Sequence, residues 1–115
     1  MRVIDNTTVS VEATWDEPVL NMDGTPLEDL AYSSVYYTVG AGSLIVGAKI
    51  PASSPLGGGH IMTTMIVPAP QGATTVFSFQ ASATDLAGNE SAKTAPVLFS
   101  VERVGPAFPR NFIAA

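Results

Sequence analysis

The sequence predicts an all-β domain, a sandwich of about seven antiparallel strands, and three observations support this fold class. Apolar residues rarely recur at helical spacing; they alternate with polar residues or gather in short runs rich in β-branched and aromatic residues. Glycine, proline and asparagine separate these runs roughly every eight to twelve residues, which is typical of a β-sandwich. A chain of 115 residues also has the size of one domain with one core.

The first expected strand covers residues 9–15, where every second residue is apolar: Val9, Val11, Ala13 and Trp15. This face should turn toward the core. Pro18 ends the strand because proline cannot donate to the ladder. Residues 16–30 contain Asp-Gly and two prolines, so we expect a long surface loop.

A second strand is expected over residues 31–39, with Ser33, Val35 and Tyr37 on one face. Residues 44–50 should form a third, short strand. Residues 51–59 contain two prolines and end in three consecutive glycines, so we expect a mobile connection.

Three further strands complete the pattern. Residues 60–67 form the first, and residues 75–83 show the clearest alternation in the chain. There the inward set is Phe77, Phe79, Ala81 and Ala83. The set expected to face water is Ser78, Gln80 and Ser82. The last strand is marked by Val97, Phe99 and Val101.

The segment 85–91, DLAGNES, should form the turn between the last two strands. Gly88 and Asn89 both tolerate positive φ. We expect Asp85 and Asn89 to stabilise this turn through side-chain to backbone hydrogen bonds.

Composition excludes several functional classes. The absence of cysteine removes disulfides, thiolate nucleophiles and zinc fingers. Five Lys and Arg residues with a single His argue against a nucleic-acid surface. No apolar run is long enough to cross a bilayer. We therefore expect neither a nucleic-acid nor a membrane partner.

The net charge of −5 is equalled by five acidic residues in one short segment: Asp16, Glu17, Asp23, Glu28 and Asp29. This segment is either a solvated loop or an acidic surface for a partner, and in the second case Asp23, Glu28 and Asp29 are the expected contacts. The spacing lacks the alternating carboxylates and glycine turn of a calcium loop. We therefore predict no metal site.

Three stretches of the sequence resemble a fibronectin type III domain of the kind found in bacterial and bacteriophage proteins: VSVEATWDEP, MDGTPLEDLAYSSVYYTVG and TVFSFQASATDLAGNES. The resemblance spans residues 9–101 and implies an immunoglobulin-like sandwich. It also implies a structural core made by Trp15, Val35, Tyr37, Phe77 and Phe79. In this family the sixth strand often begins with a tyrosine that closes a corner hydrogen bond. Phe77 stands there and lacks the hydroxyl, so about 1 kcal/mol of stabilisation is absent or replaced.

No residue pattern indicates catalysis. The chain has no nucleophile elbow, P-loop or dinucleotide-binding glycine motif, so we predict that it is not an enzyme and binds no cofactor. His60 has no second His or Cys with which to bind a metal, and we expect it to be a solvated residue at a loop edge. Trp15 could stack on a sugar, but its alternation with apolar neighbours favours core packing.

The chain divides into a sandwich over residues 1–103 and an extended arm over residues 104–115. Pro106 and Pro109 discourage a helix in the arm. We expect Phe108, Phe112 and Ile113 to dock on a neighbouring subunit. The alternative is that the arm packs on an open edge or end of its own domain.

Two functions fit these features. The first is a structural protein of a tailed-bacteriophage virion, in head decoration, neck or tail, which binds other protein subunits and includes a homo-oligomer within the assembly. No secretion signal follows Met1, which agrees with assembly in the host cytoplasm. The second is a fibronectin-type accessory or spacer module of a secreted bacterial enzyme or adhesin, outside the cell and in contact with polysaccharide. In that case Met1 is an added residue.

Overall fold

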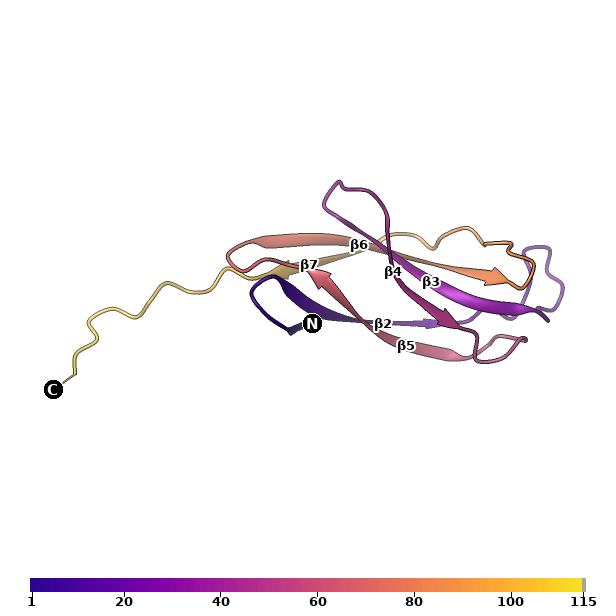
Figure 1. Cartoon of the computed structure of the whole chain (residues 1–115), viewed down its shortest axis with the longest axis horizontal. Coiled ribbons are helices and arrows are strands. Elements are labelled where there is room, and N and C mark those ends of the chain that lie inside the picture. The colour runs from indigo at the N-terminus through magenta and orange to yellow at the C-terminus, as the bar shows by residue number, and fades with distance from the viewer. Residues whose placement is uncertain (115) are drawn as a thin grey trace.

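The computed structural model describes residues 1–114, which form an immunoglobulin-like β-sandwich of antiparallel strands without helices (Figure 1). Its seven strands are β1 (Arg2–Val3), β2 (Thr8–Asp16), β3 (Leu30–Val39), β4 (Ile45–Pro51), β5 (His60–Pro68), β6 (Thr74–Asp85) and β7 (Val97–Glu102). One sheet has the order β1-β2-β5 and the other β4-β3-β6-β7. No helix in the described part of the chain is long and apolar enough to span a membrane.

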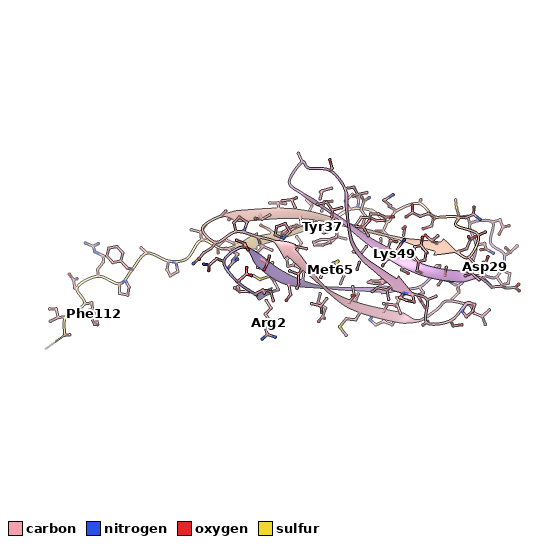
Figure 2. The ribbon with its side chains drawn as sticks, in the orientation of Figure 1. Arg2, Asp29, Tyr37, Lys49, Met65 and Phe112 are labelled. Carbon is pink, nitrogen blue, oxygen red and sulfur yellow. The ribbon has the colours of Figure 1, made fainter. Side chains whose placement is uncertain are left out.

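The core lies between the two sheets and follows the alternation of the sequence. Val9 and Val67, which pair across β2 and β5, are both 0% exposed. From the opposite sheet, Phe77 is 0% exposed and contacts Tyr37 edge to face, with ring centroids 6.1 Å apart. Figure 2 shows Tyr37 and Met65 in the interior. Val35 is buried in the same cluster, and Phe79 and Trp15 are half-buried and pack against it.

The expected strands are all present, with small changes at their ends. The strand expected over residues 44–50 runs from Ile45 to Pro51, and β6 is longer at both ends than the predicted 75–83. The sequence pattern missed β1, since two residues are too few to show an alternation. The turn after β6 forms as expected, because the Asp85 carboxylate accepts hydrogen bonds from the backbone N–H groups of Ala87 and Asn89.

Ser82 corrects the prediction for the outer face of β6. We expected this side chain to face water, but Ser82 is only 6% exposed. Its hydroxyl donates to Glu90 Oε2 at 2.6 Å, and the Tyr36 hydroxyl donates to the same oxygen. The segment after β6 therefore covers the outer face of the sheet at this position, which no alternation within β6 could reveal.

Residues 51–59 are tied to the body of the domain, in contrast to the mobile connection expected from their composition. The Glu17 carboxylate accepts hydrogen bonds from the backbone N–H and hydroxyl of Ser53 and from the N–H of Gly59. Glu17 is only 5% exposed, so it is a buried anchor and no part of a solvated acidic loop. Burial raises the pKa of its carboxyl, but the hydrogen bonds from Ser53 and Gly59 outweigh burial and lower the pKa below the usual value.

The chain beyond β7 projects from one end of the sandwich as an extended arm (Figure 1). The radius of gyration is 19.0 Å. A compact chain of this length would have a radius of gyration of about 13 Å. Figure 2 shows Phe112 far out on the arm and Asp29 at the opposite end of the molecule. The fold therefore separates the arm from the acidic segment.

Candidate functional site

The sandwich is incomplete along one side. Strand β1 pairs with Val9 and Ser10 alone, so the rest of β2, from Val11 to Asp16, has a neighbour on the β5 side only within the described chain. In the facing sheet, β7 pairs with β6 only as far as Phe79. Both sheets thus lack a full outer strand at the same end of the molecule.

The backbone of β2 is available along this open side. Ile4 N–H donates to the carbonyl of Thr8 on the β1 side. Backbone groups alternate sides along a strand, so Glu12, Thr14 and Asp16 direct their N–H and C=O groups toward the same open side. An unpaired edge of this kind is a template for an added strand.

A groove of about 580 Å³ lies in the gap. Its walls come from the end of β2, the loop after it, the start of β3, the last part of β6 and the segment that follows β6. Its apolar lining residues are Trp15, Pro18, Leu20, Met22, Leu27, Leu30, Ala81, Ala83 and Ala92. Leu20 is 54% exposed and Met22 89% exposed, so the groove presents apolar side chains to solvent. Apolar lining of this size is common in binding sites.

Hydrogen bonds and packing hold the loop wall of the groove in place. Glu17 N–H donates to the Gly59 carbonyl and Leu27 N–H to the Val19 carbonyl, while Leu27 and Leu30 are 5% and 4% exposed. Gly57 packs against this loop with φ +68°, and a Cβ there would lie 1.9 Å from the Pro18 carbonyl oxygen. Only glycine fits that position. These hydrogen bonds and packing contacts therefore fix the position of this loop as a wall of the groove.

The opposite wall is a strap, residues 90–94, which replaces β7 along the edge of β6. Backbone N–H groups of Ser91 and Thr94 donate to the carbonyls of Ala83 and Ala81, both at 2.8 Å. The side chains of the same two residues accept from the N–H groups of Ala83 and Ala81. The strap therefore pairs with the backbone groups of Ala81 and Ala83 on this edge of β6. The facing edge of β2 has no such partner within the described residues.

The groove is negatively charged. Its lining includes four carboxylates, Asp16, Asp23, Asp85 and Glu90, and no lysine or arginine. Hydrogen bonds from the Asn89 side chain and backbone lower the pKa of Asp85. Hydrogen bonds from Ser82 and Tyr36 lower the pKa of Glu90, and those from Thr25 lower the pKa of Asp23. These three groups therefore stay ionised at neutral pH, and a cationic group fits the groove.

Trp15 has two roles in this geometry. Its ring packs against the core and also lines the groove. Its Nε1 is buried and has no hydrogen-bond partner among the described residues. An unpaired buried donor costs about 1–3 kcal/mol. The fold tolerates that cost at the inner wall of the groove.

The structure gathers some of the predicted site residues and separates others. Asp23 lines the groove, whereas Glu28 and Asp29 lie outside it; the Asp29 carbonyl accepts a hydrogen bond from Leu86 N–H. Phe108, Phe112 and Ile113 lie on the arm, with exposed fractions of 85%, 85% and 83%. His60 is largely exposed, and its Nδ1 lies 2.7 Å from Asp16 Oδ1.

Sequence reasoning missed the groove itself. Its lining comes from five segments of the chain. The gap exists because β1 is short and β7 begins late. One signal was present in the sequence. The last apolar alternation begins at Val97, eleven residues beyond Leu86, so the pattern offered no following strand to pair with the second half of β6. The interval between Leu86 and Val97 contains the strap, residues 90–94, which takes the place of that strand.

Within residues 1–114, no group of three or more His, Cys, Asp and Glu side chains is arranged to hold a metal ion. The class of the domain is an immunoglobulin-like β-sandwich with an apolar, acidic groove at one end and an exposed arm at the other. No protein-family model, curated protein or solved structure matches the chain.

Proposed function

We propose that this protein is a non-catalytic structural module of a tailed-bacteriophage virion, of the fibronectin type III kind, that attaches through its arm to a repeating protein surface. The observation that carries the proposal is the arm. Phe108 and Phe112 are each 85% exposed on a segment that projects from one end of the sandwich (Figure 1). Apolar side chains in such numbers favour a protein partner.

A repeating partner surface is what makes so small a contact sufficient. Burying two Phe side chains contributes about 1.5–3 kcal/mol each before ordering costs. That is a weak single contact. Many copies on one symmetric particle share the cost of positioning and bind firmly through avidity. Head decoration, the neck and the tail of a virion all provide such repetition.

Mass spectrometry of purified particles from the host that carries the gene tests this function. The chain should be present in the particles at a stoichiometry set by virion symmetry. A chain ending at Arg103 should keep the melting temperature of the full chain and should be lost from the particles. Absence of the full chain from particles would overturn the proposal. A fall of many degrees in the melting temperature with particle binding retained would show that the arm belongs to the fold.

A second candidate function is that of an accessory or spacer module of a secreted bacterial enzyme or adhesin, in contact with polysaccharide. The observation that favours it is the groove, whose lining includes Trp15 and the polar side chains of Asn21 and Asn89. Trp15 is the only tryptophan, so its fluorescence reports any sugar that enters the groove. A saturable change with oligosaccharides favours this candidate. Capsid, portal or tail genes beside this gene favour the virion.

A further inference from the structure

We propose that the arm of one copy docks as an added strand in the Trp15 groove of a second copy, so that the chain assembles head to tail. This inference deepens the proposed function and rests on it, since it names the first partner of the arm as another copy of this chain. Three independent features carry it: the open edge of β2, the charge of the groove and the distance between groove and arm.

The arm supplies what the open edge lacks. Residues 11–16 of β2 have no neighbour on one side, and residues 108–113 of the arm have the same length. Phe108, Arg110 and Phe112 alternate along the arm, so on an added strand they share one face. Pro109 has no N–H, but alternation allows its backbone to point away from β2 while its neighbours form the ladder.

The charges of the two surfaces are complementary. Arg110 is the only charged side chain in residues 104–115, and it lies between the two Phe residues. The groove pairs apolar walls with the carboxylates Asp16, Asp23, Asp85 and Glu90. Two aromatic rings can occupy the apolar walls while the guanidinium meets the carboxylates. An acidic segment would instead place like charges beside these carboxylates.

The distance between the two surfaces favours a second copy over the same chain. Glu102 pairs with Thr74 at the start of β6, whereas the groove is lined by Ala81 and residues beyond it. At about 3.3 Å per residue, Ala81 lies roughly 23 Å along β6 from Thr74. Phe108 is six residues from Glu102, so its Cα lies at most about 20–22 Å from that of Glu102 in a fully extended chain. Phe108 would reach its own groove only if the arm reversed direction after Glu102 and ran fully extended, whereas in the structure the arm points away from the sandwich (Figure 1). A second copy is therefore the favoured partner.

The resulting contact is heterologous, because the arm is at one end of the molecule and the groove at the other (Figures 1 and 2). Head-to-tail contacts of this kind produce rings when the rotation between copies closes, and open filaments when it does not. Both products are repeating structures. A filament keeps a free arm at one end and a free groove at the other, whereas a closed ring keeps neither.

A mixing experiment with full-length variants tests the docking. The arm variant carries Phe108→Ser and Phe112→Ser, and the groove variant carries Ala92→Arg, which adds bulk and positive charge at an exposed lining position. Ala41→Arg makes the same substitution at an exposed turn outside the groove. Met22→Arg, at a lining position 89% exposed, is a second groove variant in case the first fails to fold.

Sedimentation velocity and Trp15 fluorescence give the readouts. The unmodified chain and the Ala41→Arg control should associate as concentration rises, with a change in Trp15 emission. The arm variant and each groove variant should associate at least about ten-fold more weakly. An equimolar mixture of the arm variant with a groove variant should form heterodimers and nothing larger, because only one arm and one groove remain intact.

Several results would overturn the inference. Association of both groove variants as strong as that of the unmodified chain would place the arm elsewhere, and a monomeric mixture beside an associating unmodified chain would exclude arm-to-groove pairing. An unmodified chain that is monomeric throughout, yet is found in particles, would remove this inference and leave the proposed function intact. Self-association of the unmodified chain together with its absence from particles would support this inference and overturn the proposed function.

Discussion

Truncation of Phe77 tests the register on which the whole sandwich depends. Phe77 is 0% exposed, and its ring lies 6.1 Å from Tyr37 and 5.8 Å from Phe79, centroid to centroid. Phe to Ala substitutions in cores cost about 3–5 kcal/mol, and each aromatic pair contributes about 0.5–1.5 kcal/mol beyond area. We therefore expect Phe77→Ala to cost about 4–5 kcal/mol. A domain of this size is stable by about 5–15 kcal/mol, so the variant should be close to unfolding.

Two neighbours on the same strand provide the comparison. Phe79 is half-buried, so Phe79→Ala should cost less, about 2–3 kcal/mol. Val76 is 45% exposed on the outer face, and Val76→Ala should cost under about 1 kcal/mol. Urea denaturation followed by circular dichroism gives the three values, provided that the slope of the transition stays constant. A larger cost for Val76→Ala than for Phe77→Ala would refute the reasoning, since a slip of one residue exchanges the two faces of the strand.

Three further predictions follow from single contacts. Glu17→Gln should cost about 1–3 kcal/mol at neutral pH, because a buried carboxylate accepts the hydrogen bonds of Ser53 and Gly59. Since folding lowers the pKa of Glu17, this stabilisation is present above pH 4.5 and is lost below it, so denaturation curves of the two proteins should converge in acid; a constant difference would contradict the assignment. Trp15→Phe should change the unfolding free energy by under about 1 kcal/mol, because it removes an unpaired buried donor along with some packing. Trp15→Ala should cost about 2–3 kcal/mol, because it removes the whole ring. Equal costs for the two variants would mean that Nε1 has a hydrogen-bond partner. Calorimetric titration with Ca²⁺ should show no binding below millimolar concentration, because the carboxylates of the acidic segment are dispersed. Asp16 and Asp23 line the groove, Glu17 binds Ser53 and Gly59, and Glu28 and Asp29 lie outside the groove. A midpoint in the micromolar range would contradict this prediction.

Features that depend on local alternation could be predicted from the sequence. The inward set of β2 and β6 follows directly from a period of two, and Val9 and Phe77 are fully buried as expected. The turn at Asp85 also depends on neighbouring residues alone. Prediction failed where distant segments meet. Ser82 is buried by Glu90 and Tyr36, and the segment 51–59 is held by Glu17, and none of these contacts leaves a trace in a strand pattern.

The site lies beyond local patterns for the same reason. Trp15 fits a core position by alternation, and only the shortness of β1 makes it a groove wall as well. The extended arm could be predicted beforehand, because Pro106 and Pro109 discourage a helix whatever the tertiary structure. Its proposed partner surface could not be inferred until the five lining segments were seen together.

The acidic segment gives the open edge of β2 a second property. An unpaired strand edge invites pairing with the identical edge of another copy, which is how uncontrolled aggregation begins. In this protein Glu12 and Asp16 lie on β2, and Asp23 and Asp85 line the groove beside it. Two such edges brought together would place like charges opposite each other at a cost in free energy. A segment bearing Arg110 has no such penalty. The charge of −5, which composition alone leaves unexplained, thus favours the arm over another β2 edge as the strand that completes the sheet.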